Sequence, residues 1–295
     1  MEKVKLRPSR VFVIGMIAAV VGSGLVACSP RSAPTALTAD VPLQSGKQTM
    51  LSFNAFDYRE MGVDAKNVLY LGGTGGFSTV TPGAGRPTPM KPSGNPLVST
   101  FGVAPDGRLS FVTPDGAVET IAPGSTTPEP LPFDKVTKHG RLAVGRDGAV
   151  YLADNERNKL LKLTPGATAP TELPVEIVNG LGHMVIDADD TLYAAMDGKI
   201  VKIAKDAKNA EPVAGVPDNV GGLAVDAAGN LYATDRQAGT VSRMPARGGD
   251  WVQLPFNGLQ RPSDITVDGE GNVYVMNMNL RATDTRDTIV VLAAK

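Results

Sequence analysis

An eight-residue pattern, hydrophobic-Asp-x-x-Gly-Asn-hydrophobic-Tyr, returns along this chain at a nearly constant interval. Its clearest copies are residues 225–232 and 267–274, and weaker copies occupy residues 63–70, 103–110, 144–151 and 186–193. From copy to copy, the last position advances by 40, 41, 42, 39 and 42 residues. A period near 40 residues with several short strands per unit is typical of propeller blades. The sequence therefore predicts an all-β fold, a six-bladed β-propeller.

Each unit is expected to contain four antiparallel strands. The innermost strand ends at the first position of the pattern, as at Val225. The Asp-x-x-Gly-Asn segment then forms a tight turn, because Gly and Asn tolerate positive φ. The second strand follows, as at 231–234, and the third is an alternating segment such as 241–244. We expect the fourth strand to end in the Leu-Pro-Phe motif found at 131–133 and 254–256.

The two ends of the repeat region indicate how the ring closes. The chain stops at Lys295, just after a third strand at 289–292, so the last blade lacks a fourth strand of its own. Residues 51–56 mirror residues 254–259 and precede the first innermost strand. We therefore expect an N-terminal strand at 48–53 to join the last blade, which removes an unpaired edge.

The N-terminus has the layout of a secretory signal. Basic residues precede an apolar run from Val11 to Val21 that continues to Ala27 and is short for a transmembrane helix. The segment from Leu25 to Cys28 resembles a bacterial lipobox, which implies diacylation of Cys28, the single cysteine of the chain. Two acyl chains suffice for stable anchoring. The alternative is an uncleaved membrane anchor with an incidental cysteine.

These features divide the chain into three parts. Residues 1–27 are the expected signal peptide, 28–47 the lipidated cysteine with a disordered tether rich in Ser, Pro, Thr and Ala, and 48–295 the propeller. The protein is thus expected on the extracytoplasmic face of the cell membrane, as a monomer. Loss of residues 1–27 removes four basic side chains and Glu2, which takes the net charge from −1 to −4. This acidic balance argues against a nucleic-acid partner.

Several strings resemble NHL repeats. They include 254–259 followed by Pro262, then Val267-Asp268 and 271–275. The pattern is most similar to the extracellular NHL propeller of actinobacterial receptor serine/threonine kinases, over about residues 48–295. The first two blades depart from it, because glycines at 72, 73, 75 and 76 replace the usual Thr-Asp and Ser110 replaces the tyrosine. The resemblance implies the fold, and function only loosely.

One end of the ring is the place where chemistry would be expected, because the innermost strands start there. Four positions before the end of each innermost strand the chain has Arg59, Ser99, Gly140, Gly182, Gly221 and Ser263. Three positions before it stand Glu60, Thr100, Arg141, His183, Gly222 and Asp264. Lactonase and gluconolactonase propellers resemble this fold and hold calcium with a Glu, two Asn and an Asp. The first set has no carboxylate and no Asn, and Glu60 and Asp264 make a poor cage, so neither a metal site nor a cofactor is expected.

The histidines His139 and His183 raise the alternative of a lyase of the streptogramin-cleaving kind. His183 lies at the start of an innermost strand, where a general base could face the channel. No orienting partner is evident from the sequence, so the interpretation favoured here is a polar rim residue. A catalytic residue is not assigned.

The loop after the second strand of the last blade is longer than its counterparts. Asn277 to Ile289 spans twelve steps, whereas 154–160 and 235–241 span six. The added segment carries Arg281 and Arg286, and such insertions often form binding surfaces. A solvated loop without function is equally compatible with the sequence. Asp154 and Asp235 recur at the ends of second strands, which favours loop capping over a ligand site.

The sequence thus predicts a non-catalytic lipoprotein of the cell envelope that acts as a binding or scaffold module. Its partner would be an envelope protein, a peptide or a glycan, met through the face that bears the loops between second and third strands. The candidate ligand-binding residues are Arg59, Glu60, Arg141, His183, Asp264, Asn277, Arg281 and Arg286. The alternatives are a lactonase- or lyase-type enzyme acting in the central channel, and an accessory partner of a kinase sensor propeller.

Overall fold

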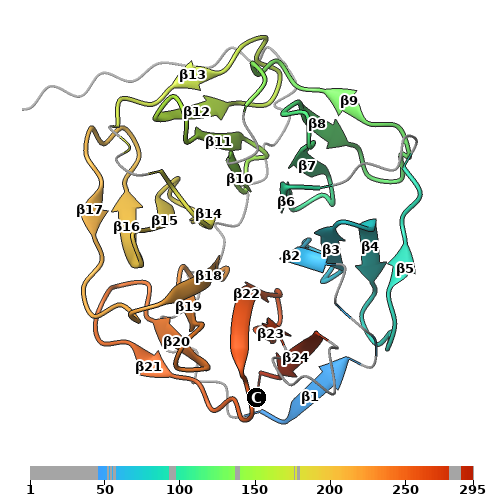
Figure 1. Ribbon diagram of the computed structural model, residues 1–295, viewed down its shortest axis with the longest axis vertical. Helices are drawn as coiled ribbons and strands as arrows, with labels where there is room; N and C mark the ends of the chain where they lie inside the picture. The colour runs from blue at the N-terminus through green and yellow to red at the C-terminus, as the bar shows by residue number, and fades with distance from the viewer. Residues whose placement is uncertain are drawn as a thin grey trace, which may run out of the picture. The chain divides into compact units, whose positions relative to one another are not determined.

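The computed structural model describes residues 46–51, 53, 55, 58–92, 98–136, 140–175, 177, 180–278 and 287–294. Six four-stranded antiparallel sheets surround a common axis (Figure 1), which confirms the expected six-bladed propeller. The expected signal peptide, Cys28, most of the expected tether, His139, Arg281 and Arg286 lie outside the described residues. Within the described ranges, no helix has the length and apolar character needed to cross a bilayer.

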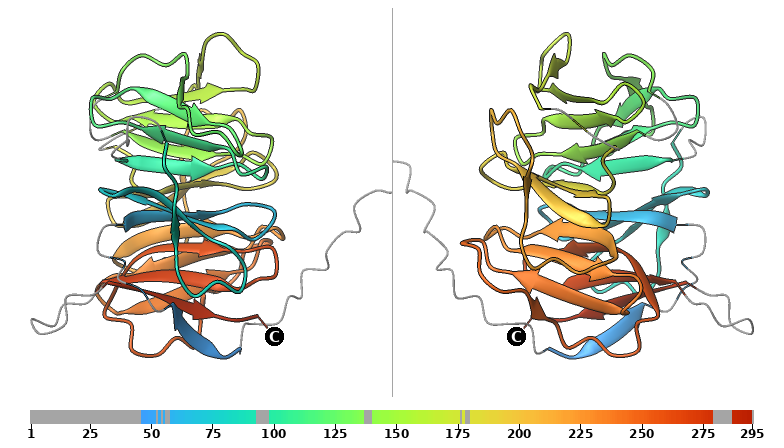
Figure 2. Two further views of the ribbon diagram at one scale, coloured as in Figure 1. Left: turned by 90° about the vertical axis from the view of Figure 1, so that its right-hand side faces the viewer. Right: turned by 60° about the vertical axis from the view of Figure 1, so that its left-hand side comes forward.

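The strands follow one order in every blade, from the axis outward. Innermost are β2 (Tyr58–Val63), β6 (Thr100–Val103), β10 (Arg141–Val144), β14 (Met184–Ile186), β18 (Val220–Val225) and β22 (Arg261–Val267). Second are β3 (Leu69–Gly73), β7 (Leu109–Val112), β11 (Val150–Asp154), β15 (Leu192–Met196), β19 (Leu231–Asp235) and β23 (Val273–Met278). Third are β4 (Gly76–Val80), β8 (Val118–Ile121), β12 (Lys159–Leu163), β16 (Lys199–Ile203), β20 (Thr240–Met244) and β24 (Thr288–Leu292). In the side views of Figure 2 the strands run along the axis of the ring, so the turns gather at its two ends.

The outermost strands are short, and here the expectation for the Leu-Pro-Phe motif needs correction. They are β5 (Thr88–Pro89), β9 (Glu129–Pro130), β13 (Thr171–Glu172), β17 (Glu211–Pro212), β21 (Val252–Gln253) and, for the last blade, β1 (Gln48–Leu51). The motif follows β9 and β21 instead of ending them, because its proline lacks the N–H that would continue the ladder. In the second copy of the motif, Leu254 is buried, and its main-chain N–H still donates to Val241 O at 2.8 Å.

The N-terminal strand closes the ring as expected. β1 pairs with β24 in antiparallel register, with Gln48 opposite Leu292 and Leu51 opposite Ile289, and the two strands lie side by side in Figure 1. The side chain of Gln48 adds a second link, since Nε2 donates to Asn257 O at 2.9 Å and Oε1 accepts from Asn257 N at 2.8 Å. β1 is thus joined to the last blade and to the loop that precedes that blade.

The repeated eight-residue pattern forms a clasp between the first and second strands. The Asp226 carboxylate accepts hydrogen bonds from the main-chain N–H groups of Ala228 and Asn230 at 2.9 Å each. It also accepts from Asn230 Nδ2 at 2.7 Å and from the Tyr232 hydroxyl at 2.9 Å. Gly229 has a φ of 84°, as the turn requires. The pattern therefore repeats because three side chains and a left-handed glycine satisfy one turn together.

Candidate functional site

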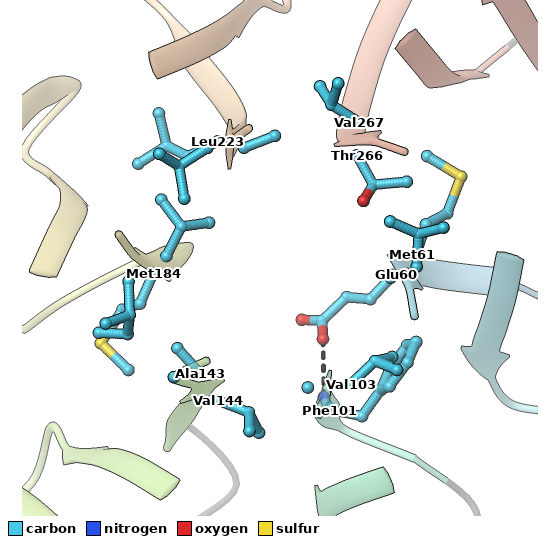
Figure 3. A pocket seen from close by; sticks show the side chains of 18 of the residues that line it. Glu60, Met61, Phe101, Val103, Ala143, Val144, Met184, Leu223, Thr266 and Val267 are labelled. Carbon is cyan, nitrogen blue, oxygen red and sulfur yellow. Dashed lines mark hydrogen bonds between the residues drawn. The ribbon is translucent and has the colours of Figure 1, made fainter. Parts of the chain in front are cut away.

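A cavity of about 470 Å³ lies at the centre of the ring. All six innermost strands contribute to its wall, and most of the lining is apolar, as Figure 3 shows for Met61, Val103, Val144, Met184 and Leu223. Polar side chains gather at the end where the innermost strands begin, namely Glu60, Thr100, Arg141 and His183. An apolar cavity with a few convergent polar groups is the usual form of a small-ligand site.

Glu60 is the carboxylate that lines this cavity at the end where the innermost strands begin, whereas Asp64 and Asp268 line it at the turns between first and second strands. Its Oε2 accepts hydrogen bonds from Phe101 N at 2.8 Å and from the Thr100 hydroxyl at 3.0 Å, both in the neighbouring blade. The other carboxylate oxygen points toward the open centre in Figure 3. Burial raises the pKa of Glu60 above its ordinary value; His183 opposes this rise and Asp264 reinforces it. The position thus holds a fixed side chain with one oxygen left to meet a ligand.

His183 has an orienting carboxylate, which corrects the expectation that it lacks one. Its Nε2 lies 2.8 Å from Asp264 Oδ1, and its Nδ1 accepts from Leu223 N at 3.3 Å. The contact with Asp264 becomes an ion pair when the imidazole is protonated; in the neutral tautomer that accepts from Leu223 N it is not a well-aligned hydrogen bond, and the buried Oδ1 has no hydrogen-bond donor among the described residues. Asp264 Oδ2 accepts from Met61 N at 2.6 Å, across the ring closure.

The imidazole reaches across a whole blade to make this contact, since His183 precedes β14 in the fourth blade and Asp264 lies on β22 in the sixth. The fifth blade has Gly222 at the corresponding position. A Cβ at Gly222 would lie 2.7 Å from Asp264 Cα and 3.0 Å from Asp264 Oδ1. The missing side chain therefore opens the path between the two groups.

The charges around His183 decide its protonation. Burial lowers the pKa of the imidazole, but the Asp264 carboxylate and then Glu60 outweigh that effect, while Arg141 opposes them. The net result is a pKa above the ordinary value of a histidine. Arg141 itself, half-buried at the start of β10, donates from Nη1 to Gly140 O at 3.1 Å.

The remaining candidates occupy different settings. Arg59 is exposed on β2 beside Glu60. Asn277 is buried at the outer end of β23, where its Oδ1 accepts from Gln260 N at 2.8 Å and Arg261 N at 3.2 Å, so it fixes a loop and does not line the cavity. The loop-capping interpretation of Asp235 is confirmed, because its Oδ1 accepts from Gln237 N and Ala238 N. Arg281 and Arg286 fall outside the described residues.

The sequence pattern predicts Glu60, Arg141, His183 and Asp264 at one end of the ring, and the structure brings them together there. The roles of Gly222 and of the Thr100 hydroxyl are not predicted by that pattern. The role of Gly222 could have been inferred from the sequence, since the successive glycines Gly221 and Gly222 at the start of an innermost strand leave space for a side chain from a neighbouring blade. In the described part of the chain, no three His, Cys, Asp or Glu side chains converge as metal ligands would.

Comparison with known proteins gives similarity of fold. No protein-family model matches the chain, and no curated protein matches it by sequence. Among solved structures, a gluconolactonase from Xanthomonas campestris is similar with a TM-score of 0.67 and 16% identity, over 86% of this chain and 92% of that one. A catalytically inactive virginiamycin B lyase from Staphylococcus aureus, solved with quinupristin, has a TM-score of 0.60 and 16% identity, over 84% and 99%.

A chain from a complex between two proteins is similar to about the same degree. A chain of the nidogen/laminin complex has a TM-score of 0.60 and 15% identity, over 72% of this chain and 85% of that one. Identities this low support the six-bladed architecture alone. Because enzymes and a protein-binding complex share this fold, function has to be argued from the residues of the site.

Proposed function

We propose that this chain is a non-catalytic binding module of the cell envelope, an NHL-type propeller lipoprotein held to the membrane through Cys28. The observation that carries the proposal is the free oxygen of Glu60 at the mouth of an apolar cavity. A ligand that presents an N–H or O–H donor to Glu60 and an apolar group to the walls satisfies both features. The ligand belongs to an envelope protein, a peptide or a glycan.

The test compares two variants of the same chemistry on the same face. Glu60→Gln keeps the size of the side chain and removes its charge, whereas Glu156→Gln changes an exposed residue away from the cavity. We expect Glu60→Gln to weaken capture of the ligand from envelope extract by about tenfold and Glu156→Gln to leave it within about twofold. Equal loss in both variants, or no loss in Glu60→Gln, refutes the proposal.

Anchoring is tested separately. Cys28→Ala should move the protein from the membrane fraction to the soluble or secreted fraction, and a fatty-acid probe should label only the wild type. Two acyl chains are needed for stable attachment, so loss of the cysteine removes the whole anchor. Equal labelling of the variant would overturn the lipoprotein assignment and leave the binding proposal intact.

A second candidate function is a lyase or lactonase, favoured by the close contact between His183 and Asp264. A general base must present a free lone pair to the substrate. In the tautomer that these contacts assign, Nδ1 accepts from Leu223 N and Nε2 faces Asp264, so neither nitrogen offers a lone pair to the cavity. Binding is therefore the first choice. Turnover of quinupristin or gluconolactone by the purified protein, abolished by His183→Asn, would reverse that order.

A further inference from the structure

One blade has lost all three side chains of the clasp. In the second copy of the pattern, Ala104 stands in place of the aspartate, Arg108 in place of the asparagine and Ser110 in place of the tyrosine. The turn itself persists, because Asp106 Oδ1 accepts from Arg108 N at 2.9 Å and Gly107 N donates to Ala104 O at 2.9 Å. The replacement of these three side chains therefore leaves the backbone of the turn unchanged and empties the space beside it.

In the other blades that space holds a tyrosine ring that packs against the next blade. Tyr70 lies in one core cluster with Leu109 and Phe111 of the second blade, and Tyr232 in one with Ile265 and Val273 of the sixth. Tyr151, Tyr193 and Tyr274 likewise pack against the following blade. The hydroxyl of Tyr70 fits where Gly107 has no side chain, since a Cβ there would lie 2.7 Å away.

Where Ser110 replaces this ring, a hollow of about 580 Å³ separates the second and third blades. Ala104, Arg108 and Ser110, the three replaced positions, all line it. Its apolar walls include Leu131 of the second blade and Val150 and Leu163 of the third. The hollow is thus the vacated tyrosine position, widened toward the surface.

Two hydroxyls give the hollow a polar point. Ser110 is only 2% exposed, and its hydroxyl has no hydrogen-bond partner among the described residues. Thr120 beside it donates to Leu109 O at 2.7 Å and keeps lone pairs for a further donor. The oxygen of the Ser110 hydroxyl is not fully buried, so solvent reaches it from the hollow, and a ligand that hydrogen-bonds to it takes the place of that solvent.

We propose that this hollow between the second and third blades is a binding site for a small molecule with a single phenolic ring. The ring lies in the volume that tyrosine fills in the other five copies, against Val150 and Leu163. It is turned end for end relative to those tyrosines, whose hydroxyls point to the clasp aspartate, so that its own hydroxyl meets Ser110. The volume falls within the range of small-ligand sites, about 300–1,000 Å³. The hollow shares Pro105 and Arg146 with the lining of the central cavity, but Glu60 does not line it, so the proposal stands or falls independently of the function assigned to Glu60.

The experiment uses p-cresol, which is the tyrosine side chain as a free molecule, and calorimetry or ligand-observed NMR. We expect one molecule of p-cresol per protein. 4-Methylcyclohexanol, which has the same size without the aromatic ring, should bind at least about tenfold more weakly. Absence of p-cresol binding, or equal binding of both compounds, overturns the proposal.

Two plugging variants locate the site. Ala104→Asp with Ser110→Tyr restores the clasp of the other blades, and Ser110→Phe fills the hollow without needing an acceptor. Either variant should remove p-cresol binding, so the test survives if one of them fails to fold. The reciprocal variant Tyr193→Ser opens the matching position between the fourth and fifth blades and should bind a second p-cresol. Undiminished binding in a folded plugging variant overturns the assignment.

A further arm identifies the source of the ring. N-acetyltyrosinamide presents the same phenol on a peptide backbone. The proposal expects it to bind at least about tenfold more weakly than p-cresol, because the backbone has to remain outside the hollow. If it binds as tightly as p-cresol, the occupant is a tyrosine of a peptide or protein and the small-molecule assignment is wrong.

Discussion

At the scale of single residues, the contact between His183 and Asp264 is the feature that most distinguishes the channel mouth. Because the pKa of His183 lies above its ordinary value of 6.5, the folded state binds the proton more tightly than the unfolded chain. Its contribution to stability is therefore fully present below about pH 6.5 and is lost as the pH rises through the folded pKa. The pKa of Glu60 is also raised, so its contribution to stability is present below about pH 4.5 and is likewise lost as the pH rises through the folded pKa.

The pKa of His183 can be measured by NMR titration of the ring protons, with the His139→Gln variant used to assign the signals. We expect the midpoint above 6.5 in the wild type. In Asp264→Asn the midpoint should fall, because the charge partner is lost while burial remains. The amide can still accept from Met61 N, which makes this a mild change. An unchanged midpoint in the variant would show that Asp264 does not control the imidazole.

At the scale of the turn between first and second strands, we expect the contribution of the clasp to the free energy of unfolding to grow with the number of its hydrogen bonds. Asp226→Ala removes the acceptor of the main-chain N–H groups of Ala228 and Asn230 and of the side chains of Asn230 and Tyr232. It should cost about 3 kcal/mol, or roughly 6–12 °C in Tm. Asp106→Ala in the blade without a clasp removes one main-chain bond and an exposed ion pair with Arg108, and should cost about 1 kcal/mol or less. Thermal unfolding of the two variants checks this. Similar losses would mean that the side-chain clasp contributes little.

The same comparison shows what the sequence could and could not predict. The turn at 226–230 is formed by residues close in sequence, so their types and spacing predict it. The six copies of the pattern predict the number of blades. The contact of His183 with Asp264 joins residues two blades apart. It depends on Gly222, which leaves space for the contact because it has no side chain. The hollow beside Ser110 likewise became visible only once the tyrosines of the other blades were seen to pack on their neighbours.

At the scale of the whole propeller, stability depends on ring closure by β1. Deleting residues 29–47 removes no residue of β1, whereas deleting 29–54 removes that strand and the Gln48 contacts with Asn257. The longer deletion exposes the edge of β24, so we expect a large fall in Tm or aggregation for it alone. Differential scanning calorimetry with light scattering distinguishes the two proteins. Equal behaviour would show that closure is dispensable.

The proposed binding face is the end of the ring that carries Glu60, and site-specific photocrosslinking in cells tests this most directly. A photoreactive residue replaces Arg59, which is exposed next to Glu60, or Lys66, which is exposed in a turn between first and second strands at the other end. We expect a crosslinked product from position 59 that disappears when Glu60→Gln is added, and none from position 66. A product from position 66 alone, or one from position 59 that Glu60→Gln leaves unchanged, would contradict it.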